Sequence, residues 1–504
     1  MAVNTLRQAS LAALRCPAWG VLALLLPAAC SGGAGSAQVV EGVSVSPSAE
    51  VRQGQSSIEI SYGRKAGGLS NVTHVDLEGL TVAIDPRSSS DDLLLEVTVP
   101  HGAAPGSRSL TFDADGATTT LAAVLEVTPI TADPSGADSQ LGTTHSPFRS
   151  LKQALAVAGS SDTCVLAAGT YAAESGETWG YAVPDGVTLT GDSSKETVLE
   201  GSVSTAPSTT GKLLDALEPM GTLTVQQLAL ADFDVGVDLK QAAQVSLEDV
   251  AIRGAGKGVL VEAGGSALRL TRGSVDSAAG AIEVAAACDG CSVTVDGTKL
   301  TNVSMAPLIQ ISEDSHHGSL TFKGAELIGS VLVGDRESTM TIEACHFMGN
   351  GNAALNFSGA QLDVTGSDFQ ANSGPYGINF NGGKMSLVDS TVEGNEYSVY
   401  QLAGTSKVRG SKFTGYSSIG YYYAKGDLDL GTATEPGNNT FEGVGAHAFG
   451  LYVDTDTTPL TCSNTTFDGM LPEPGTVTAD TEIVSQDREY LLVPGRMISF
   501  FRVP

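Results

Sequence analysis

The sequence predicts an all-β protein, in which a β-sandwich precedes a parallel β-solenoid of about 10–12 coils. A unit of roughly 22 residues recurs about ten times between Leu223 and Val453. Each copy opens with an apolar pair spaced i, i+2, as at Leu223/Val225, Val245/Leu247, Leu268/Leu270 and Leu362/Val364. A unit of this length cannot bury its apolar face alone, so the copies must stack on one another.

The composition of the repeat favours strands over helices. Each copy closes on a second alternating run, as at Val237/Leu239, Val259/Val261 and Ile378/Phe380, and glycine or asparagine lies between the runs. Two or three short strands per copy fit a β-solenoid and exclude helix-pair repeats. We expect the solenoid to cover residues 161–471, and residues 472–504, where the period fails, to form its C-terminal cap.

Two further segments precede the solenoid. Residues 38–128 contain about seven short alternating runs separated by turn residues, which predicts an Ig-like β-sandwich. Residues 129–160 are predicted to be a junction and a capping helix. Ser146 is the expected N-cap of this helix, with Pro147 at its first position and Leu151 and Ala154 on its apolar face.

The N-terminus, residues 1–29, reads as a signal peptide, with Arg7 and Arg15 before an apolar segment that is too short to span a bilayer. The small residues that precede Cys30 resemble the lipobox of bacterial lipoproteins. This resemblance implies lipidation of Cys30, a flexible tether over residues 30–37, and a lipid-anchored place at the bacterial outer membrane or cell surface. The alternative is ordinary secretion with Cys30 incidental.

Three blocks follow the predicted capping helix in a fixed order: Ala168-Gly169-Thr170-Tyr171, Gly176-Glu177-Thr178 and Pro184-Asp185-Gly186-Val187. With the junction before them, they resemble the bacterial family called domain of unknown function 1565 over about residues 131–201. The resemblance implies that the solenoid is a right-handed parallel β-helix of the pectate-lyase-like kind. It implies no activity.

The net negative charge of the chain restricts which molecules can bind it. The chain has 56 acidic against 27 basic residues and no stripe rich in lysine or arginine. This excludes nucleic acid, and it disfavours polyanionic glycans unless calcium ions bridge the like charges. We expect a monomer that contacts the membrane through its lipid and a polysaccharide as a further partner.

The cysteine pair Cys288 and Cys291 has the spacing of metal and redox motifs, but a zinc ribbon needs a second such pair. A local disulfide is the preferred interpretation, and unpaired thiols are the alternative. We predict no metal site and no cofactor; calcium stays possible without a supporting motif.

Catalytic motifs known on this fold are missing from the sequence. Hydrolases need paired carboxylates, and lyases need a basic residue near a cation that neutralises the substrate carboxylate. Because no such pattern is found, no catalytic residue is assigned. The preferred function is a non-catalytic binding or structural module for glycan. The alternative is a carbohydrate-active enzyme, a polysaccharide lyase or glycoside hydrolase, with a non-standard site.

Tyrosines gather late in the repeat, where seven of the twelve lie between Tyr376 and Tyr423. Exposed aromatic rings are good platforms for sugar rings, so six of them are candidate glycan-binding residues: Tyr376, Tyr397, Tyr400, Tyr416, Tyr421 and Tyr422. Alternation requires some of these side chains to point inward, and core filling is the competing interpretation.

Overall fold

The structure is a computed structural model that describes residues 42–467, apart from 64–68, 70, 194, 202–214, 303, 305, 314–317, 350, 372–373, 433, 445–447 and 454–459, and also residues 476–477, 490–493 and 497–500. The chain divides into two units, residues 1–36 and residues 37–504. The predicted signal peptide, tether and lipidation site Cys30 lie outside the described residues. Within the described part of the chain, no helix has the length and apolar character needed to cross a membrane.

Residues 43–128 form two four-stranded sheets around one hydrophobic core. The first sheet has the order β1-β3-β6-β5 and the second has the order β2-β8-β7-β4, with β2 and β8 parallel and the other pairs antiparallel. The strands are β1 (Val43–Ser46), β2 (Glu50–Arg52), β3 (Ile58–Gly63), β4 (Val72–Asp76), β5 (Thr81–Ile84), β6 (Asp92–Thr98), β7 (Gly106–Ala114) and β8 (Ala117–Thr128). These antiparallel sheets are compatible with the predicted sandwich.

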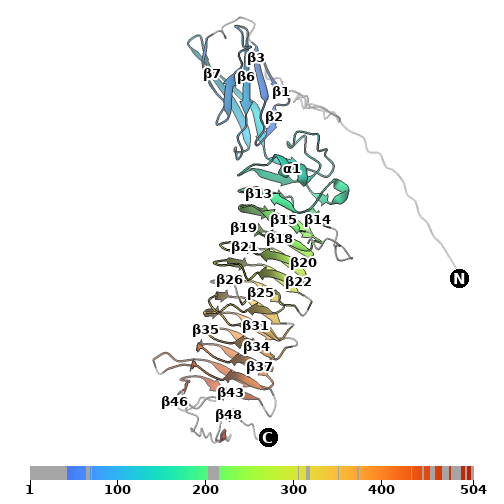
Figure 1. Ribbon diagram of the computed structural model, residues 1–504. Coiled ribbons are helices and arrows are strands. Elements are labelled where there is room, and N and C mark those ends of the chain that lie inside the picture. Colours follow the sequence, from blue (N-terminus) through green and yellow to red (C-terminus); the bar gives the residue numbers. More distant parts are fainter. Residues whose placement is uncertain are drawn as a thin grey trace, which may run out of the picture. The chain divides into compact units, whose positions relative to one another are not determined.

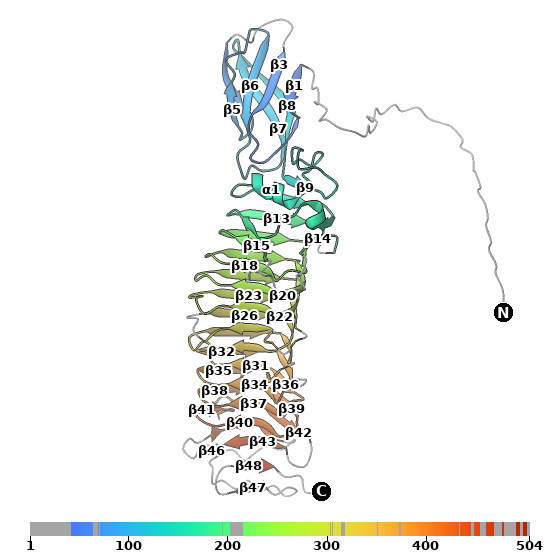
Figure 2. The same ribbon diagram turned by 45° about the vertical axis from the view of Figure 1, so that its right-hand side comes forward.

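From residue 130 onward the chain forms a parallel β-solenoid of about twelve coils, which confirms the predicted fold class (Figure 1). Equivalent strands of successive coils pair in parallel and build three ladders, which we name A, B and C. Figure 2 shows the strands of these ladders lying one above another along the solenoid.

Ladder A contains β9 (Ile130–Ala132), β10 (Thr163–Leu166), β13 (Val187–Gly191), β16 (Thr222–Gln226), β19 (Gln244–Glu248), β21 (Ala267–Thr271), β23 (Ser292–Asp296), β26 (Ser319–Lys323), β29 (Thr339–Glu343), β32 (Gln361–Thr365), β35 (Lys384–Val388), β38 (Thr405–Arg409), β41 (Asp427–Asp429) and β44 (Leu460–Thr461). Ladder B contains β11 (Gly169–Tyr171), β14 (Thr197–Glu200), β17 (Ala229–Ala231), β24 (Lys299–Asn302), β27 (Glu326–Ile328), β30 (His346–Gly349), β33 (Asp368–Ala371), β36 (Thr391–Glu393), β39 (Lys412–Tyr416), β42 (Thr440–Gly443) and β45 (Thr466–Phe467). Ladder C contains β12 (Tyr181–Val183), β15 (Asp215–Pro219), β18 (Val235–Leu239), β25 (Ile309–Ile311), β28 (Val331–Val333), β31 (Ala353–Phe357), β34 (Tyr376–Phe380), β37 (Tyr397–Gln401), β40 (Ile419–Tyr423) and β43 (Phe449–Val453). Two long strands run through ladders B and C, namely β20 (Ala251–Val261) and β22 (Ser274–Val284).

The apolar pairs of the repeat line the inside of the solenoid. Leu223 pairs with Val245 and Val245 with Leu268, and all three side chains are buried. In ladder B the rings of Phe413 and Phe441 stack with their centroids 4.4 Å apart and their planes 10° from parallel. Each fully buried apolar side chain contributes about 1.5–3 kcal/mol to stability, so the stacked core accounts for the regular period.

A short helix, α1 (Leu151–Val157), and a single 3₁₀ turn, η1 (Ala173–Ser175), lie at the start of the solenoid. The helix buries Leu151, Ala154 and Leu155. Its N-cap is Ser150, whose Oγ accepts from the backbone N–H of Gln153 at 3.1 Å, so the prediction of Ser146 is wrong. The helix starts later than predicted because Phe148 is buried and forms a β-bridge with Ala132, which keeps residues 146–148 out of the helix.

The last described strands reverse direction. β46 (Thr476–Val477) pairs antiparallel with β44, and β47 (Tyr490–Val493) pairs antiparallel with β48 (Met497–Phe500), which in turn pairs with β43. These pairings cover strand edges at the end of ladders A and C that further coils would otherwise occupy.

Candidate functional site

The outer surface of ladder C carries one row of polar side chains along the solenoid. In β34, Ile378 and Phe380 are fully buried, so Asn379 between them points away from the core. The pairing register places four further residues at the equivalent position of other coils: Asn356, Tyr400, Tyr422 and Tyr452. We name these five residues the outer row. Neighbouring members are separated by one strand spacing, about 4.8 Å.

Four of the six predicted tyrosines lie on this surface and are partly exposed: Tyr376, Tyr397, Tyr400 and Tyr422. The prediction for Tyr416 and Tyr421 is wrong, because their side chains are 1% and 0% exposed. Tyr421 has the same inward orientation as the core residues of β40, and its hydroxyl donates to Gln401 Oε1 at 2.7 Å. These two rings fill the core, as the competing interpretation holds.

Tyr452 belongs to the outer row, although sequence reasoning did not single it out. It lies beyond the stretch in which the tyrosines gather, in a strand whose Leu451 is buried. The alternation of this strand contained the signal, because the residue after Leu451 must point outward just as Tyr422 does after Tyr421.

The rings of the outer row stack on one another. Tyr422 lies between Tyr400, at a centroid distance of 4.3 Å and an interplanar angle of 18°, and Tyr452, at 4.9 Å and 8°. Tyr376 contacts the ring of Tyr400 at 4.8 Å, tilted by 40°, and partial burial together with these neighbours raises the pKa of Tyr376. Since protein rings cover both faces of Tyr422, a ligand meets the ring edge and the hydroxyl end.

Asparagine amides continue the row before the tyrosines begin. Nδ2 of Asn379 donates to Asn356 Oδ1 at 3.2 Å, and Nδ2 of Asn381 donates to the same oxygen at 3.3 Å. Among the described residues, Oδ1 of Asn379 and Oδ1 of Asn381 have no hydrogen-bond partner. Both of these oxygens are buried, so the amide groups face the outer surface mainly with their N–H donors.

A charged cluster occupies the same surface of ladder C in earlier coils. The Nζ atom of Lys240 lies 2.6 Å from Asp215 Oδ2, 2.8 Å from Glu218 Oε1 and 3.2 Å from Asp238 Oδ2. The side chains of Asp215 and Asp238 are 4% and 2% exposed, and one oxygen of each has no hydrogen-bond partner in the described residues. We name these four residues the lysine cluster.

Burial and hydrogen bonding act in opposite directions within the lysine cluster. Burial raises the pKa of Asp238 to about 6, although the hydrogen bond and charge of Lys240 lower it. Partial burial tends to lower the pKa of Lys240, but hydrogen bonds to its three carboxylate partners raise it above the ordinary value. Lys240 therefore stays protonated at neutral pH, and Asp238 exchanges its proton near the physiological range.

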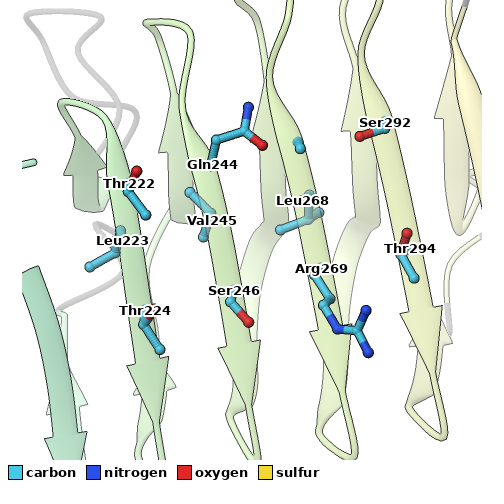
Figure 3. A pocket seen from close by; sticks show the side chains of 11 residues that line it. Thr222, Leu223, Thr224, Gln244, Val245, Ser246, Leu268, Arg269, Ser292 and Thr294 are labelled. Atoms are coloured by element: carbon cyan, nitrogen blue, oxygen red, sulfur yellow. The ribbon is translucent and has the colours of Figure 1, made fainter. Parts of the chain in front are cut away.

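Ladder A carries a shallow hollow of about 260 Å³ on its outer surface (Figure 3). Two rows of side chains line it across four neighbouring strands: Thr222, Gln244, Ala267 and Ser292, and Thr224, Ser246, Arg269 and Thr294. Five of its eleven lining residues carry hydroxyl groups, and Arg269 is its charged residue.

The two cysteines that the sequence pairs are joined in the structure. Cys288 and Cys291 form a disulfide with their Cα atoms 5.8 Å apart, and both are buried. Cys164, Cys345 and Cys462 are free thiols in the core. Over the residues that the structure describes, no group of three or more His, Cys, Asp or Glu side chains is arranged to hold a metal ion.

Solved structures with similar chain traces include carbohydrate-active proteins. A rhamnogalacturonan lyase aligns with a TM-score of 0.38 and 11% identity, over 70% of this chain and 90% of its own. The catalytic unit of a GH87 α-1,3-glucanase from Streptomyces thermodiastaticus strain HF3-3 aligns with a TM-score of 0.37 and 14% identity, over 78% and 89%. Pectin methylesterase PemA from Erwinia chrysanthemi aligns with a TM-score of 0.28 and 11% identity, over 54% and 80%.

No curated protein matches the chain in sequence. A family match exists for the segment that holds the junction, the capping helix and the first coils of the solenoid. Residues 134–254 match the family described as protein of unknown function (DUF1565), which confirms the resemblance that the sequence blocks predicted for this segment.

Proposed function

We propose that this protein is a non-catalytic glycan-binding module, held at the bacterial cell surface by a lipid on Cys30. The outer row is the observation that supports this function. It repeats hydroxyl or amide groups in register, one per coil, and a polysaccharide repeats its own hydroxyl groups along an extended chain. Tyrosine hydroxyls and asparagine amides both donate and accept hydrogen bonds, as sugar hydroxyls do.

A glycan array with residues 38–504, combined with degradation assays on the polysaccharides that bind, tests this function. We expect binding without product release, and weaker binding by a Tyr400→Ala/Tyr422→Ala variant. Release of products from any polysaccharide contradicts the non-catalytic role. An array without any bound glycan contradicts the binding role.

The lipid anchor has a separate test in the bacterial cell. Cys30→Ser removes the thiol that would carry the lipid, so we expect the variant to leave the membrane fraction. A Cys16→Ser variant, which changes a cysteine inside the predicted signal peptide, is the matched control and should stay in the membrane. A Cys30→Ser protein that still sediments with membranes contradicts the anchor.

The lysine cluster supports a second candidate, a carbohydrate-active enzyme. The distances from Lys240 Nζ limit the separation of the bonded Asp215 and Asp238 oxygens to at most about 5.8 Å, near the spacing of about 5 Å at which paired carboxyl groups act in retaining glycosidases. A raised carboxyl pKa is also typical of a general acid. However, the exposed members of the cluster are Glu218 and Lys240, and both aspartates are buried.

Activity of the wild type on any polysaccharide, lost in Asp215→Asn and in Asp238→Asn, would support the enzyme. Activity that survives both substitutions, or no activity on a broad panel, contradicts it. Both variants are compared with Glu343→Gln, which changes an exposed carboxylate on another ladder.

A further inference from the structure

The part of ladder C that holds the outer row has no charge in its sequence. The strands β31, β34, β37, β40 and β43 contain no Asp, Glu, Lys, Arg or His, although the chain as a whole has 56 acidic and 27 basic residues. The charged side chains of ladder C lie in earlier coils, as in the lysine cluster and the ion pair between Lys257 and Glu283. Five successive strands of ladder C are therefore uncharged, and Glu396, directly before Tyr397, adds a negative charge beside them.

This charge distribution restricts the ligand. A polyuronate would meet a protein of net charge −29 at a surface whose strands offer no cation, so its approach is repelled and its carboxylates gain no partner. A neutral polysaccharide suffers no such repulsion, and its hydroxyl groups match the phenol and amide groups of the outer row. The outer row therefore disfavours negatively charged glycans and offers hydrogen bonds to neutral ones.

Ring geometry restricts the binding mode. The close stacking of Tyr400, Tyr422 and Tyr452 leaves no room for a sugar ring between them, since the centroids are 4.3 and 4.9 Å apart. The outward groups are ring edges, which carry partial positive charge, and phenolic hydroxyls. Both interact favourably with the oxygen atoms of a sugar.

We infer that the outer row binds a neutral polysaccharide whose chain runs along the solenoid axis, and that it does so through tyrosine hydroxyls, ring edges and asparagine amides rather than ring faces. This inference rests on the proposed glycan-binding function. The row extends over four strand spacings, about 19 Å, so several consecutive sugar units contact it.

The triple variant Tyr400→Phe/Tyr422→Phe/Tyr452→Phe separates this role from a purely structural one. It keeps all three rings and their stacking, and it removes three hydroxyl groups. We expect the affinity for the neutral polysaccharide selected on the array to fall by about ten-fold or more, with an unchanged melting temperature. Tyr62→Phe, which makes the same change in the N-terminal sheets, is the matched control and should bind as the wild type does.

The ligand class and the length of chain that contacts the outer row are measured on the wild type by titration. Neutral oligosaccharides of increasing length are compared with oligogalacturonates of the same lengths, and we expect binding of the neutral series, with affinity that rises until the chain fills the row. Equal or tighter binding of the oligogalacturonates, a plateau already at the disaccharide, or unchanged affinity of the triple variant overturns the inference. In each of these cases a glycan is still bound, so the proposed glycan-binding function survives. If neither series binds, both the inference and the proposed function are contradicted.

Discussion

Asp238 is a single residue whose ionisation should affect the stability of the protein. Its side chain is 2% exposed, and one of its oxygens has no hydrogen-bond partner among the described residues. Burial therefore opposes its charge more strongly than Lys240 favours it, and the pKa of Asp238 rises to about 6. The pKa of an aspartate in the unfolded chain is about 3.9.

The folded protein thus holds a proton on Asp238 between about pH 4 and pH 6 that the unfolded chain has released. Its contribution to the free energy of unfolding is fully present below about pH 4 and is lost as the pH rises through about 6, a difference of about 3 kcal/mol. The free energy of unfolding, measured in urea, should decline across this range by about 3 kcal/mol more in the wild type than in Asp238→Asn, since groups outside the lysine cluster cancel in the comparison. Parallel pH profiles would contradict the raised pKa.

The lysine that neutralises the cluster has its own prediction. Lys240→Met leaves two buried aspartates without their cation, so we expect the free energy of unfolding at pH 7 to fall by about 2–3 kcal/mol, less than for a fully buried ion pair because Lys240 is itself 40% exposed. The control is Lys323→Met, which breaks a pair with Glu343 whose side chains are 58% and 55% exposed and should cost less than about 1 kcal/mol. Equal losses in both variants would mean that the cluster is effectively solvated.

Among the structural elements, the strands of the solenoid separate two kinds of stacked ring. Inward rings such as Phe413 are fully buried and stack on the next coil, whereas outward rings such as Tyr422 stack in the same manner but stay partly exposed. Ring stacking stabilises both the inward and the outward rings, but the burial of apolar surface stabilises mainly the inward rings.

Truncation of these rings should therefore differ in effect. Phe413→Ala opens a cavity in the core and should lower the free energy of unfolding by about 3–5 kcal/mol. Tyr422→Ala removes an outer ring that stacks on two neighbours and should cost about 1–3 kcal/mol, the value of two aromatic pairs. Chemical unfolding of both variants checks the difference, and similar costs would place the outer row among the main structural supports of the solenoid.

The sequence predicts the strands better than it predicts the candidate site. The alternating pairs identify the core positions because each coil must bury one face of its strands. Tyr421 and Tyr423 already fall on the buried positions of that alternation. The number of tyrosines drew attention to Tyr421, whereas the orientation of its neighbours showed that it points inward. The lysine cluster could not be predicted from the sequence, because Asp215 contacts Asp238 and Lys240 only through the register between coils. Asp215 and Glu218 lie before Leu223, where the predicted repeat begins, so its period did not place them beside Asp238 and Lys240.

For the whole molecule, the coil is the unit of folding and of length. Each coil contacts its neighbours through the same register, and Gln361 in one coil pairs with Lys384 in the next. The free energy of unfolding of such a chain is approximately the sum of the stability of each coil and of the contacts between neighbouring coils. A whole coil can therefore be removed without disturbing the register of the others, whereas part of a coil cannot.

Deletion of residues 361–383 removes one complete coil and joins strands that remain in register. We expect this variant to fold, with a near-native circular dichroism spectrum and a somewhat lower melting temperature. Deletion of residues 361–371 removes part of a coil and places ladder A strands against the wrong neighbours, so we expect it to misfold. A partial deletion that folds as well as the complete one would contradict the modular coil.

The stacked tyrosines also give the protein an optical property. Phenol rings as close as 4.3 and 4.9 Å and nearly parallel couple electronically when they absorb light, so the outer row should produce a strong near-ultraviolet circular dichroism band of its own. The chain has two tryptophans, of which Trp19 lies in the predicted signal peptide and Trp179 packs against Tyr181 and Phe233 in the first coils. The candidate site thus carries its own chromophore, and a ligand that disturbs it can be followed without a label.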